Sequence, residues 1–276
     1  MSRFFSQVDV FGSAPCMGNP VAVVLGAEGL NTEQMQRFAR WTNLSETAFV
    51  LPPRDPMADY RVRIFTPVLE LPFAGHPTLG SCHAWLEAGG EARNGSEVIQ
   101  ECKAGLVRVR NTDPGFAFAS PPLLRSGPPS EEKARHVTTT LDLDPEKVLA
   151  IEWVDNGPGW LAVLVESAAQ VMRLHPRSLD LPIGVVGFYP PGSSAQIEVR
   201  GFTSVDGRVV EDPATGSLNA SVARWLLGSG RIDAPYVAAQ GGAIGRAGRI
   251  YVSTDDEGTI WVGGRTVTVV SGTIDL

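Results

Sequence analysis

The alternation of apolar and polar residues predicts a chain rich in short strands. Tyr60, Val62 and Ile64 alternate with Arg61 and Arg63, which is the period-two pattern of a strand with one exposed face. Apolar or β-branched runs bounded by Gly, Pro, Asn and Ser indicate further strands in both halves of the chain. These strands are predicted at residues 4–11, 21–25, 47–51, 97–101, 106–110, 116–119, 149–154, 160–165, 184–189, 196–202, 250–253, 259–262 and 265–270.

A smaller number of helices interrupts the strands. Asn31 followed by Gln34 is typical of a capping box, and the apolar spacing after it predicts a helix that ends near Trp41. A second helix is predicted at residues 168–174. Two more helices begin at glycines, and they are the most informative because they share one arrangement.

In both of these helices a glycine is followed by a residue with a polar side chain. Gly75-His76 opens a helix that reaches a Trp-Leu pair after ten residues, and Gly216-Ser217 opens one that reaches the same pair after nine. Free N–H groups at a helix N-terminus attract anions. If the halves are related by a pseudo-twofold axis, both N-termini can point into one cleft and hold a carboxylate. The alternatives are chance and, for the second segment, an ordinary helix entry capped by Asp212 and Thr215.

Together these elements predict an α+β protein with two pseudo-symmetric domains, each a sheet wrapped around a helix. A chain of 276 residues is long enough for two domains. The strongest change in composition, at residues 121–132, is rich in Pro, Ser and Glu and indicates a linker or, alternatively, a surface loop within one domain. The predicted domains are residues 1–122 and 129–265.

Composition argues against several classes of function. The chain has 23 Lys and Arg against 30 Asp and Glu, a formal net charge of −7, and its basic residues are scattered, so nucleic acid is not an expected partner. No apolar run approaches the ~20 residues of a membrane span and no signal-peptide pattern is present, so we expect a cytoplasmic protein away from membranes. Three cysteines without CxxC spacing and four dispersed histidines predict neither a disulfide framework nor a metal centre.

Three ionisable side chains are candidates for chemistry. Glu46 precedes the apolar run 47–51, where partial burial would raise its pKa and suit it to carry a carbon-bound proton; the alternative is a solvated turn. His76 can bind a substrate or transfer a proton near neutral pH, or else it is satisfied by its own helix. Asp212 can orient a substrate amine or hydroxyl group, or it caps the helix.

Four sequence blocks follow one another along the chain and carry a family resemblance. They are Gly18-Asn19-Pro20-Val21-Ala22-Val23, Asn43-Leu44-Ser45-Glu46-Thr47, Arg63-Ile64-Phe65-Thr66-Pro67 with Glu70-Leu71-Pro72-Phe73-Ala74-Gly75-His76-Pro77, and Glu211-Asp212-Pro213-Ala214-Thr215-Gly216-Ser217. Together they resemble the signature blocks of the PhzF family of phenazine-biosynthesis isomerases, and the likeness covers nearly the whole chain.

The resemblance implies the diaminopimelate-epimerase-like fold. In that fold two similar domains each roll a sheet around a central α-helix, and the active site lies in the cleft between them. By the same likeness, the last strand, residues 266–276, returns to the first domain, and the protein is a homodimer.

The resemblance also implies a reaction. The member that names the family isomerises trans-2,3-dihydro-3-hydroxyanthranilate, a small carboxylic acid of phenazine and hence antibiotic biosynthesis, without a cofactor. By position, Glu46 corresponds to the proton shuttle, and the substrate is surrounded by polar groups and held by backbone N–H groups. The polar groups belong to His76, Asp212 and Ser217, and the N–H groups to Gly75 and Gly216.

Two features limit how far the resemblance reaches. Epimerases of the same fold use two cysteines, but the matching positions here lie in Ala74-Gly75-His76 and Pro213-Ala214-Thr215. Residues 245–248 depart from the usual Gly-Arg-Pro-Ser run of the family. The alternatives to the named reaction are an isomerase or epimerase of another small carboxylic acid, and a non-catalytic binding protein on the same fold.

Overall fold

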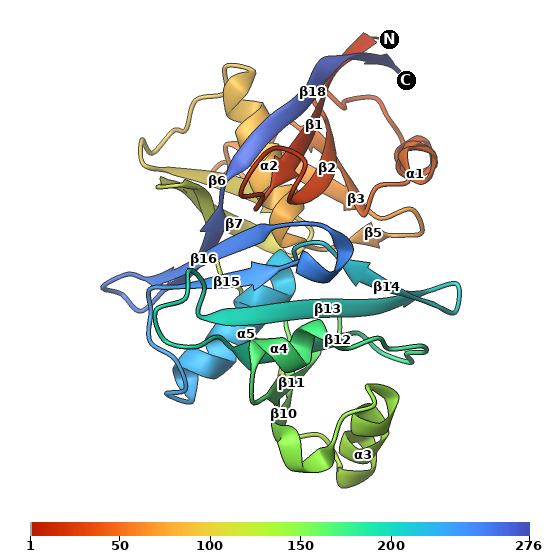
Figure 1. The fold of residues 1–276 in the computed structure, drawn as a ribbon. Helices are drawn as coiled ribbons and strands as arrows, with labels where there is room; N and C mark the ends of the chain where they lie inside the picture. Colours follow the sequence, from red (N-terminus) through yellow and green to blue (C-terminus); the bar gives the residue numbers. More distant parts are fainter. Residues whose placement is uncertain (1) are drawn as a thin grey trace. The chain divides into compact units, whose positions relative to one another are not determined.

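The computed structural model describes residues 2–276 of a mixed α+β chain, which divides into two compact units. The N-terminal unit comprises Met1–Ala119 with Gly263–Leu276, and the C-terminal unit comprises Ser120–Val262. Each unit is a curved sheet with one helix buried against it (Figure 1). The α+β class predicted from the alternation of strands and helices is confirmed.

The sheet of the N-terminal unit brings the two ends of the chain together (Figure 1). Its strands are β1 (Ser2–Val10), β2 (Asn19–Val24), β3 (Glu46–Leu51), β4 (Tyr60–Phe65), β5 (Glu70–Leu71), β6 (Glu97–Cys102), β7 (Gly105–Thr112), β8 (Gly115–Ala119) and β18 (Thr266–Asp275). Strand β1 pairs antiparallel with both β18 and β2. Strand β2 pairs parallel with β3, and β3 pairs antiparallel with β4. Strand β4 pairs parallel with β6, and the antiparallel pairs of β6 with β7 and of β7 with β8 continue the sheet.

Two helices pack on opposite faces of this sheet. Helix α2 (Gly75–Glu87) is buried almost all round through its first eight residues, so it is the central helix of the unit. It approaches β2 closely at Gly80, where a Cβ atom would meet the Cγ1 of Val21 at 2.4 Å. Helix α1 (Thr32–Thr42) is amphipathic, begins with the predicted capping box, and packs with Phe49 and Phe65 in an aromatic cluster on the other face.

The C-terminal unit repeats this plan with a different order of strands. They are β9 (Arg125–Gly127), β10 (Val148–Asp155), β11 (Leu161–Val165), β12 (Ile183–Phe188), β13 (Ile197–Val205), β14 (Arg208–Asp212), β15 (Tyr236–Gln240), β16 (Gly248–Thr254) and β17 (Ile260–Gly264), whose last two residues belong to the N-terminal unit. The ladder runs from β9 through β10, β11 and β12 to β13. Strand β13 then pairs with β15 along its first part and with β14 along its second.

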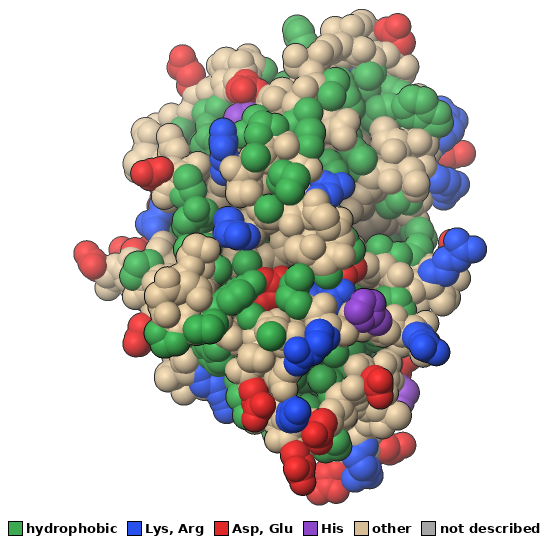
Figure 2. Space-filling view, viewed as in Figure 1, with side chains coloured by type: hydrophobic (Ala, Val, Ile, Leu, Met, Phe, Trp, Pro, Cys, Tyr) green, Lys and Arg blue, Asp and Glu red, His purple; other side chains and the backbone are tan. Residues whose placement is uncertain are grey.

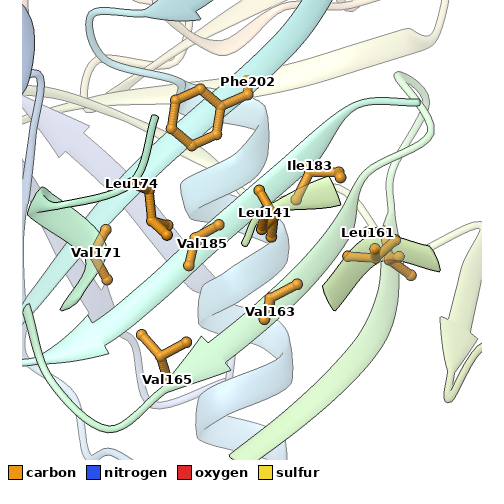
Figure 3. Close-up of a cluster of buried hydrophobic side chains, with 10 residues drawn as sticks. Leu141, Leu161, Val163, Val165, Val171, Leu174, Ile183, Val185 and Phe202 are labelled. Carbon is orange, nitrogen blue, oxygen red and sulfur yellow. The ribbon is translucent and has the colours of Figure 1, made fainter. Parts of the chain in front are cut away.

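Both faces of this second sheet are covered, which explains the continuous apolar runs in its strands. Helix α5 (Gly216–Gly228) packs against one face, and the close approach needs Gly184, where a Cβ would meet the Cδ1 of Leu218 at 2.4 Å. The other face holds a cluster of aliphatic side chains with Phe202, to which helices α3 (Glu131–Thr140) and α4 (Ala168–Met172) contribute (Figure 3). Short 3₁₀ turns occur at Pro145–Lys147 and Gly242–Ile244.

Some elements differ from the sequence predictions. The pattern did not predict α3, which buries only Val137 and Thr138, nor β14 and β15. Within the stretch predicted as a linker or surface loop, Arg125–Gly127 form β9. Figure 2 shows the Lys and Arg side chains of the visible face scattered among Asp and Glu, and no helix among residues 2–276 is long and apolar enough to cross a membrane.

Candidate active site

In the N-terminal unit, Glu46 and His76 come together at the start of two neighbouring elements. Glu46 is the first residue of β3, and His76 is the second residue of α2. The Nε2 atom of His76 lies 3.2 Å from the Oε2 atom of Glu46. The alternative that Glu46 sits in a solvated turn is wrong, because its side chain is on a strand and only 16% exposed.

Burial determines the charge of His76. The side chain is 4% exposed, and this burial lowers the pKa of the imidazole from its ordinary 6.5 to about 3, although a hydrogen bond with the Pro20 backbone opposes the shift. The ring is therefore neutral at neutral pH, and its contact with Glu46 is not an ion pair. The two atoms are close but not aligned as a hydrogen bond, and such contacts between catalytic groups commonly tighten when a substrate binds.

Asn19 orients the ring from its other side. Its Nδ2 atom lies 3.4 Å from the Nδ1 atom of His76. The Nδ1 edge of the ring therefore lies against Asn19, and the Nε2 edge faces the carboxyl group of Glu46. Asn19 is itself placed by a tight turn, in which both carboxylate oxygens of buried Asp9 accept the N–H of Gly18 at 3.0 and 3.1 Å.

The N-terminus of α2 beside these side chains is uncapped. Its N-cap residue, Ala74, has no side chain to accept a hydrogen bond, and the first turn carries no acidic residue. His76 does not cap this helix, so the alternative that it is satisfied by its own helix is wrong. The N–H groups of Gly75 and His76 precede the first backbone bond of the helix, from Thr78 to Ala74, and such groups attract an anion.

In the C-terminal unit, the start of α5 is held by a buried glutamine. Gln240, 1% exposed, makes four side-chain hydrogen bonds at 2.8 to 3.0 Å, with the carbonyl of Asp212, the N–H and hydroxyl of Thr215, and the amide of Asn219. Its amide group is directed at the turn before the helix and at the first turn of the helix itself. The turn that carries Asp212 is therefore fixed by strand β15.

Asp212 and Ser217 are held separately at this turn. The Oδ2 atom of Asp212 accepts a 2.7 Å hydrogen bond from the Thr215 hydroxyl. Thr215 is the N-cap by position, but its side chain makes no capping bond, so the alternative that Thr215 caps the helix is wrong. The Oγ atom of Ser217 accepts from the indole N–H of buried Trp160 at 3.1 Å, and its carbonyl accepts from Asn156 at 3.0 Å.

The structure thus collects the six sequence-predicted site residues into two groups. Glu46, Gly75 and His76 lie together in the N-terminal unit. In the C-terminal unit, Asp212 lies at the end of β14, and Gly216 and Ser217 lie at the start of α5. Sequence reasoning missed the residues that hold them, which are Asp9, Asn19, Asn156, Trp160 and Gln240. In residues 2–276 no group of three or more His, Cys, Asp or Glu side chains is arranged to hold a metal ion.

Similarity to known proteins identifies the family. The PhzC-PhzF family, described as phenazine biosynthesis-like protein, matches residues 8–272. The chain belongs to this family. A PhzF-family phenazine biosynthesis protein of Bacillus anthracis has the same fold, since its crystal structure covers 100% of both chains with a TM-score of 0.80 and 24% identity.

Curated relatives of this PhzF-family chain include isomerases. A trans-2,3-dihydro-3-hydroxyanthranilate isomerase of Pseudomonas aeruginosa is 36% identical over 91% of this chain and 90% of its own. A Schizosaccharomyces pombe protein named antisense-enhancing sequence 1 is 36% identical over 97% of both chains. The protein is a PhzF-family isomerase.

Proposed function

We propose that this PhzF-family isomerase moves a proton between two carbon atoms of a small cyclic carboxylic acid that carries amino and hydroxyl groups. The observation that carries the proposal is the 3.2 Å contact between Glu46 and a neutral, buried His76 beside an uncapped helix N-terminus. A largely buried carboxyl group can exchange a proton with carbon, and the neutral ring can hold it in place without adding a charge.

Glu46 acts first as a base and then as an acid. Its carboxylate takes a proton from one ring carbon, so that a C–H bond breaks, an O–H bond forms, and the electron pair moves into the ring. The same proton then returns to a second carbon, which regenerates the carboxylate. No oxidant or reductant is consumed, because the product is an isomer of the substrate.

The helix N-termini hold the acid group in this proposal. Neither α2 nor α5 has a side-chain cap, and neither has an acidic residue in its first turn. The N–H groups of Gly75 and Gly216 are therefore the proposed donors to the substrate carboxylate. Asp212 contacts the amine or hydroxyl group, and Ser217, whose hydroxyl is oriented by Trp160, donates to a substrate oxygen.

We propose trans-2,3-dihydro-3-hydroxyanthranilate as the substrate, on the basis of the family resemblance and the 36% identity to the Pseudomonas aeruginosa isomerase. A second candidate is an isomerase of another small carboxylic acid outside phenazine biosynthesis. What favours it is that the Schizosaccharomyces pombe relative, whose name points to no phenazine substrate, is equally similar at 36%.

Proton NMR of the incubated substrate in D₂O distinguishes these candidates. For the first, we expect conversion of trans-2,3-dihydro-3-hydroxyanthranilate with changes in its ring protons. Binding without conversion would contradict the proposed reaction on this compound. Absence of binding would point to a different acid and overturn the substrate assignment.

A further inference from the structure

A cavity in the N-terminal unit lies on the sheet face opposite to Glu46 and His76. Its volume is about 530 Å³, within the range of small-molecule sites, and its walls come from the ends of β3 and β4 and from the segment before α1. Successive side chains of a strand point to opposite faces. Glu46 on β3 faces α2, whereas Thr47 bonds to Thr42 at the end of α1, and Leu51 shares this second face.

Three arginines line this cavity, and only one has an ion-pair partner among the described residues. Arg63 forms a two-pronged ion pair with Glu70, at 2.7 and 2.8 Å, and is thereby neutralised. The guanidinium groups of Arg54 and Arg61 have no carboxylate oxygen within 4.0 Å in residues 2–276. The Nε atom of Arg61 is also buried without a hydrogen-bond partner. A buried guanidinium donor without an acceptor is unfavourable, and an anion would relieve it.

Nearby carboxylates do not serve as the acceptor for the buried Nε donor of Arg61. Burial lowers the pKa of Arg61. Repulsion from Arg54 lowers it further, and this effect is larger than the opposing attraction of Glu101. One oxygen of Glu101 already accepts the backbone N–H groups of Arg54 and Asp55, at 2.6 and 3.0 Å. Glu28 lines the cavity but is exposed to solvent.

The remaining wall is apolar. Leu30, Met35, Leu51, Pro52 and Pro53 line it, and Met35 and Leu51 belong to the core beneath α1. A bare inorganic ion would leave these side chains without contacts, whereas a ligand with an apolar ring or chain would cover them.

We propose that this arginine pocket, defined by Arg54, Arg61 and the apolar wall, binds a small carboxylate with an apolar ring or chain. The carboxylate accepts hydrogen bonds from Arg61 and Arg54, and the ring packs against Leu30 and Pro52. The site is separate from the proposed isomerase site, because the two lie on opposite faces of the N-terminal sheet.

Titration of the ¹⁵N-labelled protein with benzoate tests the pocket. We expect saturable shifts in the amide signals of residues 28–35 and 51–63. Benzamide, which has the same ring without the charge, should bind at least about tenfold more weakly, as should inorganic phosphate, which has the charge without the ring. Shifts confined to residues 43–47 and 74–78 would overturn the proposal, and so would equal affinities for benzoate and either of the other two compounds.

Substitutions identify the arginines responsible. Arg61→Met and Arg54→Gln should each weaken benzoate binding about tenfold, because each removes a charged donor. Arg54 is exposed, so Arg54→Gln keeps the test decisive if Arg61→Met fails to fold. Arg37→Gln is the matched control, since Arg37 is exposed on α1 and does not line the cavity. Unchanged benzoate affinity in Arg54→Gln, or equal weakening in Arg37→Gln, would contradict the assignment.

Discussion

Acidification should weaken the fold through His76. Burial lowers the pKa of this ring from 6.5 to about 3 in the folded state. A histidine whose folded pKa is depressed takes up a proton only on unfolding, so its contribution to stability is present above pH 6.5 and is lost as the pH falls below that value. Between pH 7 and pH 5 the folded ring stays neutral while the unfolded ring becomes protonated, which lowers the free energy of unfolding by about 2 kcal/mol.

Glu198 acts in the opposite direction over the same range. Burial raises the pKa of its carboxyl group from 4.5 to about 7. The folded state therefore keeps a proton that the unfolded state loses, and this carboxyl group makes the fold less stable as the pH rises from 4.5 toward 7. The pH dependence of the wild type alone is consequently a sum of opposing contributions. Comparison with a variant that lacks His76 isolates one of them.

The assay is urea unfolding of the wild type and of His76→Asn at about pH 7 and about pH 5. The wild type should lose about 2 kcal/mol more than the variant on acidification. Glu198 and His83, a partly buried histidine of α2 whose pKa is also lowered by burial, contribute equally to both proteins. His175→Asn, at an exposed histidine, is the control and should behave like the wild type. Equal losses in the wild type and His76→Asn, or an NMR titration midpoint of His76 near 6.5, would refute the account of a buried neutral ring.

Three substitutions in the C-terminal unit test how α5 and its N-terminus are held. Gln240→Met breaks four buried hydrogen bonds and should lower the free energy of unfolding by about 3 kcal/mol or more, measured in urea. Gly184→Ala places a Cβ 2.4 Å from the Cδ1 of Leu218 and should cost about 1–3 kcal/mol, measured in the same way. Trp160→Phe removes the donor to Ser217 and should lower kcat/KM about tenfold, with a smaller effect on Tm, measured by steady-state kinetics and calorimetry.

Each of these predictions has a result that contradicts it. Gln196→Met is the control for Gln240→Met, because Gln196 makes one exposed side-chain bond, to the Val237 N–H, and its loss should cost less than about 1 kcal/mol. Equal costs for the two would mean that the Gln240 network does not hold the turn. A fully stable Gly184→Ala would show that α5 is free to shift. Unchanged kcat/KM in Trp160→Phe would show that the reaction does not depend on the orientation of the Ser217 hydroxyl by Trp160.

Local signals in the sequence predicted the elements on which the site is built. Alternation located β4, the capping box located α1, and the glycines at positions 75 and 216 marked the first residues of α2 and α5. These features depend on neighbouring residues, so they can be read from a short window.

The residues that hold the site side chains in place do so through contacts between distant parts of the chain. Gln240 reaches Thr215 across 25 residues, and Asn19 reaches His76 across 57. The sequence around Thr215 does not indicate that its hydroxyl donates to Asp212 and accepts from distant Gln240 instead of capping α5. Helix α3 was missed because only Ala134 and Val137 among its ten residues are apolar, which is too few to mark a buried face.

Replacement of Glu46 by Gln tests the central proposal most directly. The amide keeps the size of the side chain and can still contact His76, but it cannot accept a proton from carbon. Turnover of trans-2,3-dihydro-3-hydroxyanthranilate by Glu46→Gln should fall to the background rate, while calorimetry should still detect binding of the substrate. Wild-type turnover in this variant would contradict the assignment of Glu46 as the group that carries the proton.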